Sequence, residues 1–450
     1  MIKTKAKAQA KKVVRTIITP VEKFLATESA GGLVLMFTTV VAMVWANSPY
    51  YLSYEHFIHA PLGLKIADFF IEKSLQHWVN DGLMVIFFFV VGLEIKRELF
   101  LGELSSPKKA ALPMFAALGG MLVPAGFYAI FNNGELGQHG WGIPMATDIA
   151  FAVGILTLFS RKVPFALKIF LLALAIVDDL GAVLVIAFFY TDEIARNALG
   201  FAAIGFGVIS LLKFSGIRKF LVYIILGIVI WFAVLKSGIH ATIAGVILGL
   251  LTPTNPFMDE KEALNEIDSL ATDLAKDLKK SEGAGTQQLS DDTKCRLDKI
   301  STLIHDSHSP LDTWIHFLHP WVSYFIMPIF ALVNAGVHIE GITIADFATN
   351  NISIGIILGL VLGKPIGVLI AAFISVKLNI AVLPKGVSWY QMAAVGFLAG
   401  IGFTMALFVS NLALNGDASL EIYSKTAILV ASLIAGLIGA GMLILCKDRP

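Results

Sequence analysis

Residues 174–188 read LAIVDDLGAVLVIAF, an apolar run that carries two adjacent acids, Asp178 and Asp179. The apolar character extends over 165–190, which is long enough to cross the hydrocarbon core of a membrane, because about 20 apolar residues suffice. A charged side chain at the centre of a membrane helix costs roughly 2.5–3.5 kcal/mol. The stretch therefore predicts a membrane helix whose two acids are paired, neutralised or in contact with water.

The composition of the whole chain indicates the same environment. Of the 450 residues, 56% are hydrophobic and only 15% are charged, whereas about 25% of the residues of soluble domains are charged. The formal net charge of +1 gives no reason to expect a nucleic-acid partner. Two cysteines, Cys295 and Cys446, provide neither a disulfide framework nor a cysteine metal site.

Apolar stretches of membrane-spanning length recur from residue 30 almost to the C-terminus. We expect twelve helices, at 30–47, 77–99, 109–131, 141–160, 165–190, 197–213, 219–235, 238–252, 314–337, 353–376, 388–412 and 424–446. The division between the seventh and the eighth helix rests only on the residues LKSG. The expected fold class is an all-α polytopic membrane protein.

Lysine and arginine are unevenly divided between the two sides of this predicted bundle. With the N-terminus inside, the inner connections contain Lys96, Arg97, Lys108, Lys109, Arg161, Lys162, Lys213, Arg218, Lys219, Lys377 and Lys385. The outer connections contain Lys65, Lys73, Arg196, Lys236 and Lys425. Because connections rich in lysine and arginine stay in the cytoplasm, both termini are predicted to be cytoplasmic.

The predicted helices divide the chain into five parts. These are a basic cytoplasmic N-terminal arm at 1–29, helices one to eight at 30–252, a polar cytoplasmic loop at 253–312, helices nine to twelve at 313–446 and a cytoplasmic tail at 447–450. In the polar loop, a short amphipathic helix is predicted by Leu264, Ile267, Ala271, Leu274 and Leu278. We expect a solvated connection there, with a regulatory or partner-binding function as the alternative. In the outer connection 48–76, the pattern predicts a small hairpin or an interfacial segment.

Glycine and proline interrupt two of the predicted helices. Helix four, GWGIPMATDIAFAVGIL, contains Gly142, Pro144 and Gly154, with Thr147 and Asp148 between them. Helix eleven, AVGFLAGIGFTMALF, contains Gly396, Gly400 and Gly402, followed by Thr404. Interruptions at corresponding positions of two halves indicate a transporter binding site. Each break also leaves partly charged helix ends inside the membrane. We expect Asp148 to neutralise N-terminal ends and Lys364 to neutralise C-terminal ends.

Lys364 is the only cation near the centre of a predicted helix, and three central acids compete for it: Asp148, Asp178 and Asp179. Adjacent residues of a helix point about 100° apart, so Asp178 and Asp179 have different neighbours. Lys364 is expected to pair with one acid, and the sequence leaves open which one. At least one other acid then remains for function. It is either protonated, because burial disfavours the charged form, or a hard oxygen ligand for a small cation.

Seven stretches that follow one another over most of residues 77–413 resemble the NhaA family of bacterial sodium/proton antiporters. They are HWVNDGLMVIFFFVVGLEIKREL, PMATDIAFAVGIL, LALAIVDDLGAVLVIAFFY, VLKSGIHATIAGVILG, HPWVSYFIMPIFALVNAGV, LGKPIG and GFLAGIGFTMALFVSNLA. The resemblance implies inverted repeats in which helices four and eleven are interrupted and cross each other. Interrupted helices are among the known features of that family, so this expectation is not independent of the resemblance.

The resemblance also implies functions for individual residues of this chain. The ion-binding and proton-exchange site, and hence the Na⁺ ligands, would be Asp179 and its neighbour Asp178. The residues that balance the charges of the helix crossing would be Asp148, Thr147 and Lys364. The cytoplasmic funnel and the pH response would involve Glu94, Arg97, Glu98, His240 and Asp81.

The activity that the resemblance implies is secondary transport and not catalysis. The family exchanges Na⁺ or Li⁺ for inward-moving protons by alternating access, electrogenically and under the control of pH. No cofactor is implied beyond the transported ions. The expected location is the bacterial cytoplasmic (inner) membrane, where the chain crosses the lipid bilayer many times and forms a homodimer.

Two features of the chain depart from the family pattern. Ile315 stands where the family commonly has an acid before the His-x-x-His-Pro stretch, and the loop 253–312 is enlarged and acidic. Both departures concern the pH response and leave the ion site unaffected. Ordinary ion pairs at a helix end would also explain the spacing of Glu94, Arg97 and Glu98.

Other functions fit parts of the sequence. A transporter for an organic substrate would need a set of substrate-binding groups, and the sequence shows no such set. An intramembrane aspartyl protease would carry its two acids on separate helices in Tyr-Asp and Gly-x-Gly-Asp contexts, and neither context occurs in the chain. A channel would conduct ions without coupling them to protons. A single histidine such as His240 is more often a packed or capping residue, and the sequence makes no carboxylate partner for a metal site evident beside His316 and His319.

Overall fold

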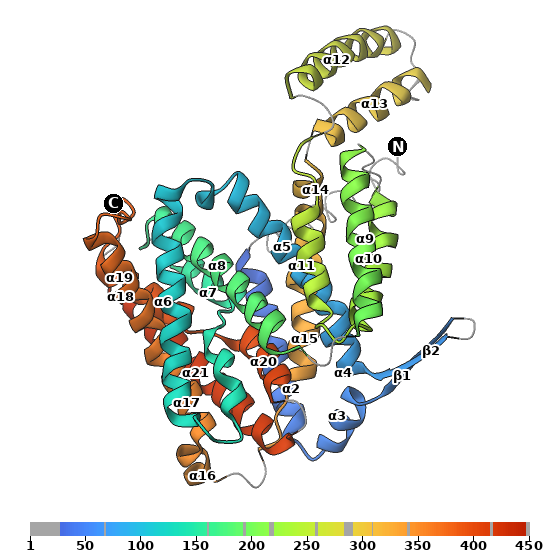
Figure 1. Ribbon diagram of the computed structural model, residues 1–450. Coiled ribbons are helices and arrows are strands. Elements are labelled where there is room, and N and C mark those ends of the chain that lie inside the picture. Colours follow the sequence, from blue (N-terminus) through green and yellow to red (C-terminus); the bar gives the residue numbers. More distant parts are fainter. Residues whose placement is uncertain are drawn as a thin grey trace, which may run out of the picture.

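The computed structural model describes residues 28–446, except 67–68, 160–161, 192–194, 216–219, 257–259, 283–290, 308, 340–342 and 415–416. Within the described residues the chain forms a bundle of helices, and a two-stranded sheet projects from it (Figure 1). Most of the predicted arm at 1–29 and the whole predicted tail at 447–450 lie outside the described residues.

The elements follow one another in three parts of the chain, and the label η marks a short 3-10 or π helix. The first part contains α2 (Glu28–Ala46), α3 (Tyr51–Ile58), β1 (Pro61–Ile66), β2 (Phe69–Ser74), α4 (Leu75–Trp78), η1 (Val79–Leu83), α5 (Met84–Phe100), η2 (Glu103–Ser105), α6 (Pro107–Asn132), η3 (Gln138–Met145) and α7 (Ile149–Leu158). The second part contains α8 (Phe165–Phe189), α9 (Arg196–Phe214), α10 (Phe220–Leu235), α11 (Thr242–Leu251), α12 (Glu260–Glu282) and α13 (Asp291–Ser307). The third part contains α14 (Pro310–Trp321), η4 (Val322–Ile326), α15 (Met327–Asn334), α16 (Ile344–Thr349), α17 (Asn351–Leu358), η5 (Gly359–Gly363), α18 (Lys364–Lys377), α19 (Trp389–Ala399), α20 (Phe403–Ala413) and α21 (Ala418–Ile444).

Seven helices of the described part are long and apolar enough to cross a membrane. They run over Leu75–Phe100, Pro107–Asn132, Gln138–Leu158, Phe165–Phe189, Pro310–Asn334, Asn351–Lys377 and Ser419–Ile444. Two bent helix pairs raise the number to nine if each pair is one span, and shorter apolar helices lie over Arg196–Leu212, Val222–Leu235 and Thr242–Leu251. Each of these helices overlaps a predicted one, except Tyr51–Ile58, the second helix of one bent pair, which lies in the predicted outer connection 48–76. The all-α polytopic fold class is therefore confirmed, while the count of twelve spans stays a prediction.

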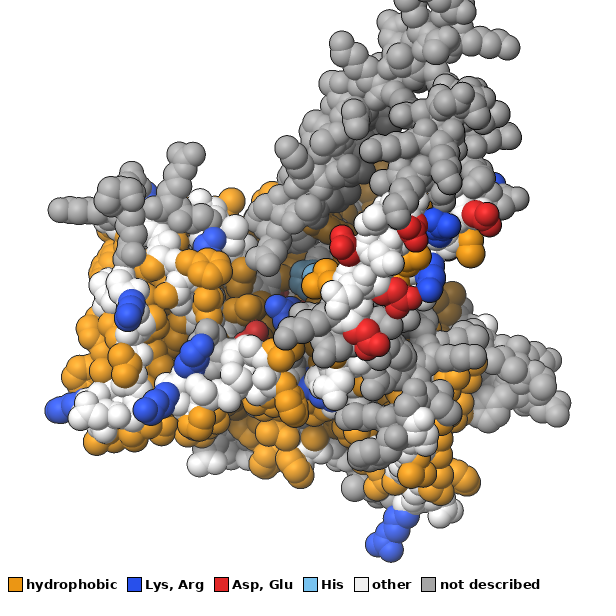
Figure 2. All heavy atoms as spheres, turned by 90° about the horizontal axis from the view of Figure 1, so that it is seen from above, with side chains coloured by type: hydrophobic (Ala, Val, Ile, Leu, Met, Phe, Trp, Pro, Cys, Tyr) orange, Lys and Arg blue, Asp and Glu red, His pale blue; other side chains and the backbone are white. Residues whose placement is uncertain are grey.

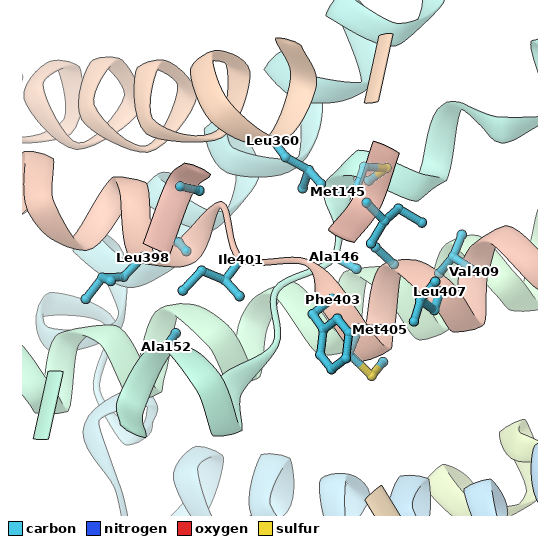
Figure 3. Packing of buried hydrophobic residues seen from close by; sticks show 14 of the residues in the cluster. Met145, Ala146, Ala152, Leu360, Leu398, Ile401, Phe403, Met405, Leu407 and Val409 are labelled. Atoms are coloured by element: carbon cyan, nitrogen blue, oxygen red, sulfur yellow. The ribbon is translucent and has the colours of Figure 1, made fainter. Parts of the chain in front are cut away.

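The predicted helices four and eleven are both broken, and the breaks cross each other. The first passes from η3 through the extended residues 146–148 into α7, and the second passes from α19 through 400–402 into α20 with a bend of 44°. Figure 3 shows the two connecting segments crossing near Ala146 and Ile401. The backbone N–H of Asp148 donates to the carbonyl of Ile401 at 2.7 Å and joins the two segments directly.

The helices are interrupted at fewer glycines than the sequence predicted. Pro144 lies in η3 just before the first break, and Gly400 caps the end of α19 at the second. Gly154 lies inside α7 and Gly396 inside α19, so the prediction of an interruption at these two residues is wrong. A glycine within a membrane helix keeps its backbone hydrogen bonds, and it does not by itself end the helix.

The helices form two groups, each packed within itself. The crossing group contains η3, α6, α7, α8, α17, α18, α19, α20 and α21, with α6 packed along α17 and α18. The flanking group contains α5, α9, α10, α11, α14 and α15, with α5 packed along α11, and α2 contacts both groups. Small residues permit the close approach of membrane helices. A Cβ on Gly119 of α6 would collide with Gly367 of α18, and one on Gly92 of α5 would collide with Val246 of α11.

The outer connection after α2 contains a small hairpin. The sequence predicted either such a hairpin or an interfacial segment at this place. β1 pairs with β2 in an antiparallel register that places Pro61 opposite Ser74. The indole N–H of Trp78 donates to the carbonyl of Leu62 at 2.9 Å and ties the hairpin to the start of the following span. In Figure 1 the hairpin extends away from the helical bundle.

The polar loop contains two helices where the sequence predicted one. α12 includes the predicted amphipathic stretch, and α13 follows it. The two helices pack against each other, and Lys299 of α13 forms an ion pair with Glu266 of α12 at 2.8 Å. Figure 2 views the molecule from the side of these helices and shows Lys and Arg side chains spaced along the rim of this face. The sequence predicts that this face is cytoplasmic.

Candidate functional site

Asp148 joins the two helix breaks through a single carboxylate. Its Oδ1 accepts a hydrogen bond from the N–H of Phe151 at 3.1 Å and caps the N-terminus of α7. Its Oδ2 accepts from the N–H of Thr404 at 3.1 Å and from the Thr404 hydroxyl, at the N-terminus of α20. N-terminal helix ends carry partial positive charge, so a buried carboxylate between two of them is stabilised by both. These contacts are the ones expected of a residue that compensates helix charges.

Lys364 lies at the same crossing and pairs with Asp178. Its Nζ lies 2.7 Å from Asp178 Oδ2, and both side chains are inaccessible to solvent. The ammonium also donates to the carbonyl of Met145, the last residue of η3, and so compensates a C-terminal helix end. The sequence left open which acid Lys364 holds, and in this structure it is Asp178.

Thr147 completes the contacts around the buried ion pair. Its hydroxyl oxygen lies 2.9 Å from Asp178 Oδ2 and 2.8 Å from the carbonyl of Ala399, the last residue of α19. Thr147 thus meets one C-terminal helix end, and Lys364 meets the other. Each of the four helix ends at the crossing is thus in contact with a side chain of the protein itself.

Asp179 differs from its neighbour because no described residue hydrogen-bonds to it. Asp179 is buried, and neither of its carboxylate oxygens has a hydrogen-bond partner among the described residues; Oδ1 of Asp178 also lacks one. A buried carboxylate without a partner is unfavourable as an anion. It therefore takes up a proton or binds a cation. Asp179 is the acid of the crossing whose contacts leave it available for either.

A cavity of about 370 Å³ connects Asp179 with one end of the bundle. At the crossing its wall includes Asp148 and Thr404, and farther out it includes Glu94 in the second half of α5 and Lys168 in the first turn of α8. These helix ends point toward the side of α12 and α13 (Figure 1). Both helix groups and α2 contribute to the wall, so the cavity lies where the groups meet.

The residues expected in the cytoplasmic funnel lie in different parts of the structure. Glu94 belongs to the cavity wall, whereas Arg97 is exposed, Glu98 is half-buried, and neither belongs to that wall. Asp81 lies on the same span almost four helical turns before Glu94, or about 20 Å along the axis. Asp81 is therefore near the opposite end of the bundle from the outer part of the cavity.

Asp81 and His240 lie side by side although they are distant in the sequence. His240 Nε2 is 3.7 Å from Asp81 Oδ1, and His240 Nδ1 is 2.7 Å from the hydroxyl oxygen of Thr242. The ring of Phe408 packs edge-on against the imidazole, with 5.3 Å between the centroids. The structure thus brings together two of the five residues expected in the pH response.

Sequence reasoning missed the structural part that Lys96 plays on α5. Lys96 is 5% exposed, and its Nζ donates to the carbonyls of Leu250 and Thr252 at 2.7 and 2.5 Å, at the C-terminus of α11. The sequence analysis counted it only among the positive charges of the inner connections. No pattern separates Lys96 from the exposed Arg97, because the difference depends on which face of α5 meets α11.

The fold and the site together define a class of protein. A multi-pass bundle in which two interrupted helices cross inside the membrane, beside a buried ion pair and an acid without a partner, has the architecture of a secondary transporter. Comparison with known proteins gives the particular family. The family model described as Na⁺/H⁺ antiporter 1 matches residues 22–443, and the chain belongs to this family.

Relatives with the same kind of name align over nearly the whole chain. The protein named Na(+)/H(+) antiporter NhaA 2 of Sorangium cellulosum is 45% identical over 95% of this chain and 90% of its own length. The proteins named Na(+)/H(+) antiporter NhaA of Oleidesulfovibrio alaskensis and Yersinia enterocolitica are 46% and 43% identical, over 93% and 94% of this chain and 92% and 96% of their own lengths. The family predicted from the sequence is confirmed, and it is a family of transporters and not of enzymes.

Proposed function

We propose that the chain is a secondary active antiporter that extrudes Na⁺ or Li⁺ in exchange for inward-moving protons, electrogenically and under the control of pH. Its family supports the identity of the exchanged ions. The observation that carries the proposed site is Asp179, a buried acid without a hydrogen-bond partner that lines a cavity of about 370 Å³.

One carboxylate serves two competing ligands at this site. Protonated, Asp179 is neutral and needs no partner in the interior of the membrane. Deprotonated, it offers two hard oxygens to Na⁺ or Li⁺, and Oδ1 of the adjacent Asp178 is another buried oxygen without a partner. A cation and a proton exclude each other because they use the same oxygens.

Two adjacent acids allow the exchange to move net charge. When Asp179 and Asp178 both take up a proton in exchange for one Na⁺, each cycle carries one net positive charge inward. The membrane potential then adds to the proton gradient as a driving force. Lys364 compensates Asp178 while that acid is deprotonated, and the 2.7 Å distance between Lys364 Nζ and Asp178 Oδ2 supports this role.

We assign the pH response to titratable groups of the flanking group. Glu94 lies in the wall of the cavity, where protons arrive from the same side as the ion, and the Asp81–His240 pair joins η1 to the residues just before α11. Ile315 replaces the acid that the family commonly has at its position, and it is buried against Leu93 of α5. The response of this chain therefore lacks a contribution from position 315.

The proposed setting is the bacterial inner membrane, with both termini in the cytoplasm. The apolar spans require a lipid bilayer, and the distribution of lysine and arginine supports the orientation. We propose a homodimer that forms through the β1–β2 hairpin, because this hairpin extends from the bundle and leaves its outer edges unpaired within the described residues.

Everted membrane vesicles that hold an imposed proton gradient test the proposal. Added Na⁺ or Li⁺ is expected to collapse the gradient in vesicles with the wild-type chain. The variant Asp179→Asn keeps the size of the side chain and removes the charge, so exchange should fall by about a hundredfold or more. The matched control is Asp298→Asn on the exposed surface of α13, which should exchange like the wild type.

Two results would contradict the proposal in different ways. If neither cation collapses the gradient in wild-type vesicles, the chain is not a Na⁺/H⁺ antiporter. If the wild type works and Asp179→Asn retains full exchange, the antiporter function stands and the site is wrong. Saturation of the rate with Na⁺ separates a transporter from a channel in the same experiment.

A further inference from the structure

Four amide side chains meet at the end of the bundle opposite the cavity. Gln76 and Asn80 lie at the start of the span that continues as α5, Asn334 ends α15, and Asn411 lies in α20. We call these four residues the outer amides. None of them contacts the carboxylates of the crossing, and the exchange described above does not use them.

Asn334 is the centre of the outer amides. Its Oδ1 accepts hydrogen bonds from Asn411 Nδ2 at 2.8 Å and from Gln76 Nε2 and Asn80 Nδ2 at 3.3 Å each. Its Nδ2 donates to Asn80 Oδ1 at 2.9 Å and to the carbonyl of Phe330 at 2.9 Å. Asn334, the centre of the network, is 1% exposed, whereas Gln76, Asn80 and Asn411 are half-buried.

The bond between Asn334 and Asn411 joins the two helix groups. Asn334 belongs to α15 of the flanking group, as Asn80 belongs to the span of α5, whereas Asn411 belongs to α20 of the crossing group. Thr404, in the wall of the cavity, lies on the same helix as Asn411, about 10 Å along the axis. The network therefore fastens the ion-binding part of the molecule to its neighbours on the far side of the site.

Three phenylalanines fill the space between the cavity and the outer amides. Phe408 of α20 is fully buried, and its ring centroid is 5.3 Å from that of Phe88 and 6.1 Å from that of Phe330. Along α20, Phe408 stands between Thr404 and Asn411. We call the three rings the phenylalanine layer. An apolar constriction of this kind excludes water and ions while its side chains are in contact.

The closed arrangement leaves one polar group unsatisfied. Oδ1 of Asn411 is buried and has no hydrogen-bond partner among the described residues. A buried carbonyl oxygen without a partner is unfavourable. Water that entered from this end would supply the missing hydrogen bond. Separation of the outer amides therefore gives this oxygen a water partner without costing it any protein hydrogen bond.

We propose that the phenylalanine layer and the outer amides form the gate that closes the Asp179 site toward this end of the bundle, and that the Asn334–Asn411 bond breaks in every transport cycle. The inference rests on the proposed function, because a gate is needed only where the site alternates between two ends. Asn334 and Asn411 are positioning residues that do not touch the ion. The Asn80–Asn334 bond lies within the flanking group and stays intact.

Reversible cross-linking tests the gate. In a chain that carries Cys295→Ser and Cys446→Ser, the pair Asn334→Cys/Asn411→Cys is joined by a short bifunctional methanethiosulfonate reagent. Na⁺-dependent collapse of the gradient should fall by about tenfold or more, because one conformation is locked, and dithiothreitol should restore it. After the same treatment, the matched pair Asn80→Cys/Asn334→Cys should exchange within about twofold of its own rate before treatment.

The results of cross-linking distinguish failure of the gate from failure of the proposed function. Full exchange by the cross-linked Asn334→Cys/Asn411→Cys protein, or equal loss in both pairs, would overturn the gate. Loss of Na⁺ binding by the cross-linked protein would also overturn it, because the cavity still opens at the other end. Absence of gradient collapse in the untreated wild type would instead contradict the proposed function.

A single substitution keeps the gate testable if the cysteine pair does not fold. Asn411→Ala removes the bond between the groups and favours opening at this end. The KM for Na⁺ should then fall on the outer side and rise on the inner side, each by about twofold or more. The control is Asn132→Ala, because Asn132 also has a buried unpartnered oxygen but bonds only to Tyr128 and Asn351 within the crossing group. Parallel changes of both KM values in Asn411→Ala would overturn the gate.

Discussion

Two identical side chains at adjacent positions have different environments at the helix crossing. Asp178 is bound by Lys364 and Thr147, whereas Asp179 has no hydrogen-bond partner among the described residues. The helical step of about 100° per residue predicts that the two acids differ. It does not predict which one Lys364 holds, because the pairing depends on how α8 is rotated against α18. That rotation is set by contacts between helices, and no pattern along one helix reveals it.

The buried pair makes a prediction about stability. Lys364→Met leaves Asp178 without its counter-charge in a site closed to solvent, and we expect a loss of about 3–5 kcal/mol in the free energy of unfolding. The double variant Lys364→Met/Asp178→Asn removes both charges and should recover most of the loss. Thermal unfolding of the purified protein in detergent measures both. A double variant no more stable than Lys364→Met would contradict the pairing.

A second ion pair of the chain provides the control for that prediction. Lys425 and Glu421 lie 2.9 Å apart one turn from each other on α21, and both side chains keep some contact with solvent. Lys425→Met should therefore change the free energy of unfolding by less than about 1 kcal/mol.

At the scale of elements, the sequence predicted the breaks of helices four and eleven but not all of their positions. Pro144 and the glycines at 400 and 402 mark the breaks, because a proline lacks a donor and glycines tolerate irregular backbone. Gly154 and Gly396 carry the same local signal inside intact helices. The sequence also did not predict α13, because its start follows a glycine-rich polar stretch that is typical of flexible segments.

Close helix packing makes a prediction for two glycines on one helix. A Cβ on Gly119 of α6 would collide with the backbone of Gly367 on α18, whereas a Cβ on Gly126 of α6 would meet no atom within 4 Å. Gly119→Ala should therefore lose about 1–3 kcal/mol of stability through overpacking. Gly126→Ala should be neutral or stabilising, since alanine favours a helix by about 1 kcal/mol over glycine. Melting temperatures in detergent compare the two, and equal values would contradict the packing.

For the whole molecule, the sequence predicted the class of fold and the polar connection that contains α12 and α13. It did not predict how the helices divide into two groups. Hydropathy identifies the spans because each must bury about 20 residues in lipid. It contains no information on which spans pack together, since all of them are apolar. The contacts of Asp179, Lys96 and the outer amides depend on that grouping, and they could be found only in the structure.

The position of the cavity between the groups predicts how transport depends on pH. In the proposed function, protons and Na⁺ reach Asp179 through the cavity that it lines and compete for the same oxygens. Once the pH falls low enough for Asp179 to be protonated, each further decrease of one pH unit should raise the KM for Na⁺ by about tenfold for every proton that competes with the ion. The rate at saturating Na⁺ should change little. Initial rates in vesicles between pH 6 and 9 measure this. A KM independent of pH throughout would exclude direct competition.

The volume of the cavity has a consequence for selectivity. About 370 Å³ is room for roughly a dozen water molecules at about 30 Å³ each. In the proposed function, a small cation shares this cavity with several water molecules and exchanges them for carboxylate oxygens at the crossing. On that proposal, the preference between Na⁺ and Li⁺ depends on the balance between the cost of this last dehydration step and the strength of the carboxylate oxygens.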